Sequence, residues 1–260
     1  MTAMDLIDTH CHLDVCEFDA DRDAVLARSR AQGVRRMLVP AIQAQGWDTL
    51  LTLCARESGL FPALGLHPVY LDQHRPEHIA ALERRVAEKR PVAIGEIGLD
   101  YYIEDPEPAR QQQLFEAQLE IARSAALPAV IHVRKAHDQV LKTLRRIRLR
   151  GGTIHAFNGS LQQGQQYIEL GFKLGFGGTL TYEGSKRIHR LARDLPLEAL
   201  VLETDAPDIP VASHRGERNS PEYLPECLAA LARVRDLDPA TVARQTTRNA
   251  CELFGLTASA

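Results

Sequence analysis

The chain has 260 residues, of which 45% are hydrophobic and 25% are charged, and its net charge is −3. This is the composition of an ordinary globular protein. It is not that of a protein that binds nucleic acid through an overall positive charge. The length is enough to bury a full hydrophobic core and suits one domain, residues 1–260, of α/β-barrel size. No basic-then-apolar leader opens the sequence and no apolar run is long enough to span a membrane, so we expect a cytoplasmic protein without membrane contact.

Short apolar runs rich in Val, Ile and Leu alternate with longer amphipathic stretches along the chain. In chain order, the expected strands are 5–9, 34–40, 60–65, 91–96, 127–133, 153–157, 172–177 and 200–204. The expected helices are 22–32, 46–57, 76–89, 108–125, 138–148, 162–170, 184–194, 221–235 and 239–254. Pro221 and Pro239 mark two helix starts, because each follows a residue that can cap a helix, Ser220 or Asp238.

The alternation of strands and helices predicts a parallel sheet. Eight strand–helix repeats at this length favour the closed form, a (β/α)8 TIM barrel of the metal-dependent hydrolase type. An open, doubly wound sheet is the alternative, but no GxGxxG motif follows the first strand.

Two histidines, His10 and His12, stand at the end of the first expected strand. Successive side chains of a strand alternate between its faces, so these two imidazoles point the same way and can share one metal ion. An HxH sequence also occurs by chance at polar strand edges, and alone it does not decide between the two interpretations.

The other strand ends favour the metal site. Metal-capable side chains also close four later apolar runs, namely Glu96, His132, His155 and Asp205. In a parallel barrel all carboxyl ends of the strands lie on one rim, and a carboxylate or imidazole there costs free energy unless it is paired. Together these groups predict a divalent-metal site. Imidazoles suit zinc or manganese and carboxylates also accept magnesium, so the identity of the metal is open.

Three further groups are candidates for substrate binding. His67 follows the third strand and is either a substrate contact or a capping histidine. Arg134 shares a face with His132 if the strand continues, where a guanidinium suits a phosphate or carboxylate; a surface arginine is the alternative. Arg215 belongs to the segment 214–221, which combines polar donors with a helix start and suits an anion, or is simply a solvated loop.

A cluster of basic residues near the fifth helix is interpreted as structural. It lies at the carboxyl end of that helix, on the opposite rim from the metal-capable groups, where cations complement the helix dipole. Its members are Lys142, Arg145, Arg146, Arg148 and Arg150.

Seven segments carry distinctive motifs: 7–12 (IDTHCH), 65–68 (GLHP), 93–102 (AIGEIGLDYY), 155–160 (HAFNGS), 203–207 (ETDAP), 215–221 (RGERNSP) and 246–250 (TTRNA). In this order, and over nearly the whole chain, they resemble the TatD family of metal-dependent deoxyribonucleases, within the amidohydrolase-like barrels. The pattern resembles the YjjV-like branch of that family. Many members carry HCF where this chain has 155–157 and an aromatic residue in place of Asp208, but neither departure removes a metal-capable group.

The resemblance implies a (β/α)8 barrel with two divalent ions, zinc, manganese or magnesium. The first ion would be held by His10, His12 and Asp205, the second by His132 and His155, and Glu96 would bridge the two.

It also implies an exonuclease-like hydrolase of DNA or another nucleic-acid phosphodiester, acting through a metal-activated water. Asp205 would orient that water and accept its proton, with Glu96 and His67 as the other candidate catalytic residues. We expect a monomer. The first alternative is an amide or ester hydrolase with the same ligands, for example one that cleaves aminoacyl esters from tRNA. A non-catalytic metal-binding barrel is the second, and it would not need polar groups around the ligands.

Overall fold

The fold is the (β/α)8 barrel that the sequence predicts, in a computed structural model that describes residues 5–256. One parallel sheet has the strand order β1 to β8, the same as the chain order. The strands are β1 (Leu6–Asp8), β2 (Val34–Pro40), β3 (Leu60–Leu64), β4 (Ala93–Asp100), β5 (Ala129–Arg134), β6 (Gly152–Ile154), β7 (Phe172–Phe176) and β8 (Leu200–Leu202).

Helices follow the strands in regular alternation. They are α1 (Arg22–Ala31), α2 (Trp47–Arg56), α3 (Glu77–Lys89), α4 (Pro108–Ser124), α5 (His137–Arg146), α6 (Leu161–Glu169), α7 (Lys186–Asp194), α8 (Leu224–Arg235) and α9 (Pro239–Phe254). None of the helices in residues 5–256 combines the length and apolarity needed to cross a lipid bilayer.

The chain divides into two compact units. Unit 1 combines Met1–Val39, Ala156–Leu161 and Leu174–Ala260, and unit 2 combines Pro40–His155 and Gln162–Lys173. The expectation of a single domain over residues 1–260 stays a prediction, and its ends, 1–4 and 257–260, lie outside the described residues.

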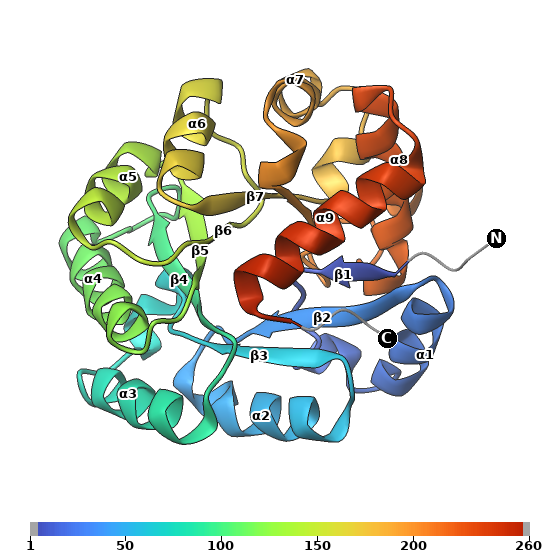
Figure 1. Cartoon of the computed structure of the whole chain (residues 1–260). Helices are drawn as coiled ribbons and strands as arrows, with labels where there is room; N and C mark the ends of the chain where they lie inside the picture. The colour runs from blue at the N-terminus through green and yellow to red at the C-terminus, as the bar shows by residue number, and fades with distance from the viewer. Residues whose placement is uncertain (1–4, 257–260) are drawn as a thin grey trace. The chain divides into compact units, whose positions relative to one another are not determined.

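Unit 1 joins the two ends of the chain. β1 pairs with β2, and the backbone N–H and the hydroxyl of Thr9 both donate to the carbonyl of Leu202, each at 3.0 Å. The helix α9 packs beside β1, as Figure 1 shows in red and blue. The expected cap of α9 is confirmed, because the Asp238 side chain accepts from Thr241 N. The expected Ser220 cap is not formed: a 3₁₀ turn (Pro221–Tyr223) comes first, and α8 begins at Leu224.

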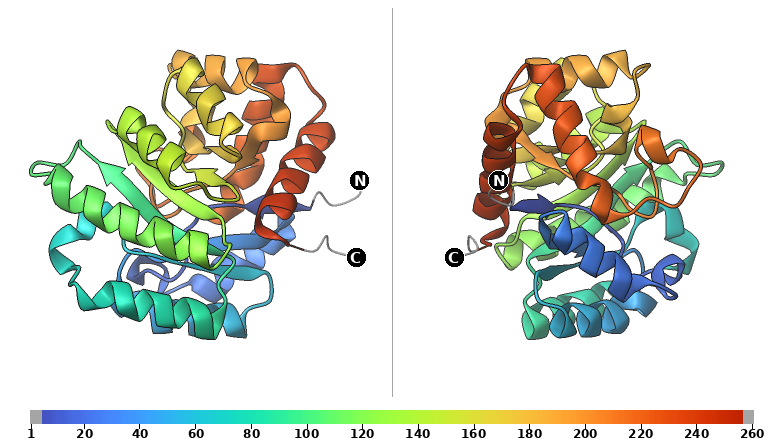
Figure 2. Two further views of the ribbon diagram at one scale, coloured as in Figure 1. Left: turned by 60° about the vertical axis from the view of Figure 1, so that its left-hand side comes forward. Right: turned by 90° about the vertical axis from the view of Figure 1, so that its right-hand side faces the viewer.

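Unit 2 is built around the long strand β4. All of its residues are buried, and α4 packs along it, as the left view of Figure 2 shows. β4 continues past the expected end at Glu96 to Asp100, which pairs with Arg134. Gly98 allows this continuation, because a Cβ there would lie 1.9 Å from the carbonyl oxygen of His132.

Candidate metal centre

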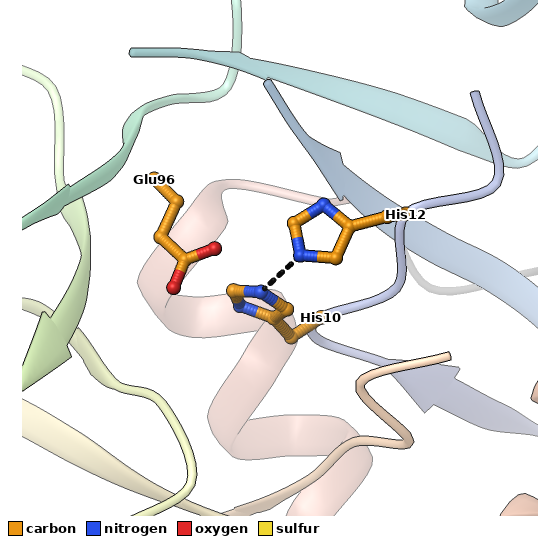
Figure 3. A group of neighbouring side chains, drawn as sticks. All are labelled: His10, His12 and Glu96. Atoms are coloured by element: carbon orange, nitrogen blue, oxygen red, sulfur yellow. Dashed lines mark hydrogen bonds between the residues drawn. The ribbon is translucent and has the colours of Figure 1, made fainter. Parts of the chain in front are cut away.

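Unit 1 contains a cluster of three metal-capable side chains, here called the His10 cluster: His10, His12 and Asp205. The Nε2 atoms of the two histidines are 3.1 Å apart, and Oδ1 of Asp205 lies 3.6 Å from the first and 3.8 Å from the second. Figure 3 shows the two imidazole rings edge to face, with these nitrogen atoms turned toward each other. Three potential ligand atoms therefore converge on one point.

The backbone beneath the His10 cluster is held by Asp8. This fully buried carboxylate accepts from the backbone N–H groups of His10 and Thr204, at 3.1 and 3.0 Å, and from the Thr204 hydroxyl at 2.6 Å. Burial raises the pKa of Asp8 to about 7, although the hydrogen bonds from Thr204 and His10 act in the opposite direction. One carboxylate thus ties the segment after β1 to the segment after β8.

Asp205 reaches the His10 cluster through a left-handed backbone turn. Its φ is +63°, a conformation that aspartate tolerates better than most residues, and its N–H donates to the carbonyl of His10 at 2.8 Å. β1 ends at Asp8 and β8 ends at Leu202. His10, His12 and Asp205 therefore lie beyond the strands, whereas the sequence had placed them at the strand ends. The residues after Leu202 leave the strand conformation to follow this turn.

Unit 2 contains a second cluster, here called the Glu96 cluster: Glu96, His67, His132 and His155. Oε1 of Glu96 lies 3.1 Å from Nδ1 of His132, 3.2 Å from Nε2 of His67 and 3.9 Å from Nε2 of His155. The Glu96 side chain is only 2% exposed. Three imidazoles therefore surround one buried carboxylate.

A second carboxylate orients His132. Oδ2 of Asp100 lies 2.8 Å from Nε2 of His132, which leaves Nδ1 facing Glu96. Burial acts to lower the pKa of His132, but its hydrogen bonds with Asp100 and Glu96 outweigh this and raise the pKa. Burial likewise acts to raise the pKa of Asp100, and hydrogen bonds from His132 and from Tyr102 N hold it below the usual value. Asp100 is therefore an ionised acceptor that fixes the ring.

His67 enters the Glu96 cluster with a defined tautomer. Its Nδ1 accepts a hydrogen bond from the backbone N–H of Val69 at 3.2 Å. The neutral ring must then carry its proton on Nε2, the atom that faces Glu96. The expected capping role of His67 is confirmed, because its ring caps the 3₁₀ helix Pro68–Gln73, and the other nitrogen of the same ring lies beside Glu96.

The spacing of these atoms fits a bound ion. Bonds of about 2.1 Å to a tetrahedral metal place neighbouring ligand atoms about 3.4 Å apart. The atoms of the His10 cluster are separated by 3.1–3.8 Å, and His67, Glu96 and His132 also form a group whose ligand atoms lie close enough to hold a metal. The donor chemistry, imidazole with carboxylate, suits a divalent transition ion.

The other predicted substrate-binding residues lie outside both clusters. β5 does continue to Arg134, whose guanidinium stacks on the ring of Tyr102 at 3.9 Å. Arg215 is an exposed loop residue. In the same loop Arg218 forms an ion pair with Asp21 at 2.8 Å, and the buried Asn219 side chain donates to three backbone carbonyls. These two residues hold the loop in place.

Sequence reasoning missed three carboxylates that support the clusters: Asp8, described above, Asp100 and Glu203. Oε1 of the buried Glu203 accepts from Ala156 N at 2.6 Å, and so fixes the backbone just after His155. Gly175 makes room for this side chain, because a Cβ there would lie 2.2 Å from Oε2 of Glu203. All three carboxylates sit within motifs that the sequence displays, IDTHCH, GEIGLD and ETDAP, but their partners are identifiable only in three dimensions.

A (β/α)8 fold with two imidazole–carboxylate clusters at its strand ends defines a metal-dependent hydrolase. A family model described as "TatD related DNase" matches residues 7–255, and the chain belongs to the TatD family.

Named relatives agree with this assignment. An Escherichia coli K12 protein described as an uncharacterized metal-dependent hydrolase, YjjV, is 39% identical over 96% of this chain and 98% of its own length. The crystal structure of E. coli YjjV superimposes with a TM-score of 0.94 at 38% identity, covering 99% of this chain and all of the other. A Klebsiella pneumoniae protein named 3'-5' ssDNA/RNA exonuclease TatD is 33% identical, covering 96% of this chain and 98% of that protein.

Proposed function

We propose that this metal-dependent hydrolase cleaves phosphodiester bonds of DNA, acting at strand ends or on single strands. The observation that carries the proposal is the pair of imidazole–carboxylate clusters, each with ligand atoms at metal-binding distances. The strand ends of a (β/α)8 barrel share one rim, and for this reason we propose that both clusters serve one centre.

The proposed centre holds two divalent ions, with zinc, manganese and magnesium as the candidates. His10, His12 and Asp205 would hold the first ion, His132 and His155 would hold the second, and Glu96 would be the ligand common to both. Such ions, when bound, make a hydroxide nucleophile available near neutral pH and neutralise charge on the attacked phosphoryl group.

Asp205 is the proposed general base. Its Oδ1 points toward the two histidines of the His10 cluster, and its side chain is 14% exposed, so that water can reach it. The hydrogen bond from its backbone to His10 fixes the direction of the carboxylate. In this role Asp205 orients the attacking water and accepts its proton.

His67 and two arginines complete the proposed substrate contacts. With its proton on Nε2, neutral His67 acts as a donor to Glu96 or to a phosphoryl oxygen. Arg134 and Arg215 are exposed cations that suit the phosphates of a substrate strand.

The name of the Klebsiella relative supports nucleic acid as the substrate class, whereas the name of the E. coli relative YjjV specifies no substrate. A cytoplasmic location and a monomeric state stay predictions.

Product analysis tests the proposal. Metal-depleted protein is reloaded with zinc, manganese or magnesium and incubated with end-labelled single-stranded and duplex DNA, alongside a panel of carboxylic esters and amides that includes an aminoacyl ester. We expect release of nucleotides from the DNA and little turnover of the carbonyl compounds. Efficient cleavage of esters or amides with no cleavage of DNA would replace the phosphodiesterase proposal with the alternative hydrolase.

A further inference from the structure

Tyr102 is an exposed aromatic residue close to the Glu96 cluster. It follows β4 in unit 2 and is 58% exposed, the highest fraction among the exposed large hydrophobic side chains of residues 5–256. The guanidinium of Arg134 lies 3.9 Å from its ring centroid and Nζ of Lys135 lies 6.0 Å from it. We call these three residues the Tyr102 platform.

The platform is anchored to the metal-capable groups. The backbone N–H of Tyr102 donates to Oδ1 of Asp100 at 2.9 Å, and the other oxygen of that carboxylate holds His132. The backbone N–H of Tyr101 donates to the carbonyl of Arg134 at 2.9 Å. The ring and the cations therefore stand on the ends of the two strands that supply Glu96 and His132.

The two cations are available to a ligand. Neither Arg134 nor Lys135 forms a salt bridge with a carboxylate among residues 5–256, and both are exposed. The backbone of Lys135 has a φ of +57°, which turns the chain immediately after β5. The nearby Asp100 carboxylate attracts Arg134 without forming a salt bridge with it. Two exposed cations that form no salt bridge within the described part of the chain, beside an exposed ring, make a site with both a π face and positive charge.

That combination matches the chemistry of an unpaired nucleotide. Every base has a flat face that stacks on an aromatic ring, and the adjoining phosphate attracts Arg and Lys. In a duplex the base is already stacked and paired, so a lone exposed ring selects bases that are free. The alternative is a structural cation–π pair of Arg134 and Tyr102 that only fixes the end of β5. Such a pair does not require the second cation, Lys135, near the same ring.

We propose that the Tyr102 platform is a subsite for one unpaired nucleotide that flanks the bond to be cleaved: the base stacks on Tyr102, and its phosphate contacts Arg134 and Lys135. This inference rests on the proposed nuclease function and deepens it, because it assigns the preference for unpaired strands to particular residues.

The test uses the full-length, manganese-loaded protein and a short end-labelled oligothymidylate. A series of the same oligonucleotide carries one abasic residue, at each of the nucleotides nearest the cleaved end in turn. For the parent protein, we expect one abasic position to lower kcat/KM by about five- to twentyfold, in the lower part of the range for base–aromatic stacking. Tyr102→Leu should cleave the intact and the abasic strands at nearly equal rates, whereas Tyr102→Phe, which keeps the ring, should retain the discrimination.

A charge variant provides a second measurement. Lys135→Asn suits the left-handed backbone and removes the charge, and it should reduce the slope of log KM against log salt concentration by about 0.7, the value for one phosphate contact on a single strand. The matched control is Arg148→Gln, an exposed cation in the loop after α5, which should change neither KM nor the slope.

Two kinds of failure are distinguishable. If the parent cleaves the oligothymidylate but Tyr102→Leu still discriminates against the abasic position, or loses activity equally on all strands, the platform is structural and this inference is overturned alone. If the parent, with its metal content verified, cleaves no oligonucleotide, the proposed function is overturned and the inference with it.

Discussion

Replacement of Asp100 by asparagine tests whether this carboxylate controls the metal affinity of the Glu96 cluster. In the parent, Asp100 accepts two hydrogen bonds, from Nε2 of His132 at 2.8 Å and from the N–H of Tyr102 at 2.9 Å. This arrangement favours a proton on Nε2 of His132, so that Nδ1, the atom that faces Glu96, could bind the proposed metal ion. Asparagine has one oxygen and one NH2 group, so it cannot accept from both partners.

Either orientation of the amide therefore has a cost. If its oxygen faces Tyr102, the NH2 group meets His132 and favours the tautomer with the proton on Nδ1, which cannot bind metal. If its oxygen faces His132, its NH2 group faces the backbone N–H of Tyr102, and two hydrogen-bond donors oppose each other. Asp100 is 1% exposed, so water does not replace the lost bond. An unsatisfied buried donor costs about 1–3 kcal/mol, and loss of an outer carboxylate typically weakens metal binding about 10- to 100-fold.

The energetic cost and the expected loss of affinity agree, since a tenfold change in the dissociation constant of the metal corresponds to about 1.4 kcal/mol of binding free energy. We expect Asp100→Asn to weaken metal binding about 10- to 100-fold in a competition titration with a chelating dye, while circular dichroism shows a folded protein. Asp138→Asn is the matched control, because Asp138 is an exposed carboxylate that accepts from Gln163. Metal affinity equal to that of the parent in Asp100→Asn would refute the role of this carboxylate in orienting His132.

Three further variants test the other features of the site. Asp205→Asn should lower kcat by about 10²–10⁴-fold even at saturating metal, because an amide cannot accept the proton of the attacking water. If the variant instead recovers the parent rate at full metal occupancy, Asp205 acts only as a metal ligand. The double variant His10→Ala/His12→Ala should lose bound metal in elemental analysis while its circular dichroism is retained; unchanged metal content would remove these histidines from the ligand set. Gly175→Ala should lower the free energy of unfolding by about 1–3 kcal/mol, because its Cβ would overlap a buried carboxylate at 2.2 Å. Gly184→Ala, where a Cβ meets nothing within 4 Å, is its control, and equal stability of the two variants would contradict the packing argument.

The pattern of strands and helices could be predicted because each strand of this fold is a short apolar run and each helix a longer amphipathic stretch. The ends of the strands were predicted less well. β4 continues to Asp100 through Gly98, a residue that in isolation indicates a break but here permits close approach to β5. β1 ends at Asp8, before the histidines, so the alternation of strand faces does not explain why their Nε2 atoms meet.

The metal-capable side chains were identifiable because each follows an apolar run, where an isolated polar group is costly. Their supporting groups were not. Asp100 and Glu203 act through atoms that come close only in the fold, the Nε2 of His132 and the backbone N–H of Ala156. The position of His67 beside Glu96 likewise depends on a turn in which Val69 donates to its ring.

The connection between the beginning and the end of the chain has a consequence for protein synthesis. Asp8 and Thr204, which hold the His10 cluster together, are 196 residues apart. Ribosomes add about 5–20 residues per second, so the first histidines wait roughly 10–40 seconds for their carboxylate partner to be translated. The residues of the Glu96 cluster are all present once His155 has been added. A nascent chain interrupted between residues 155 and 205 therefore carries every side chain of one cluster and lacks the aspartate of the other.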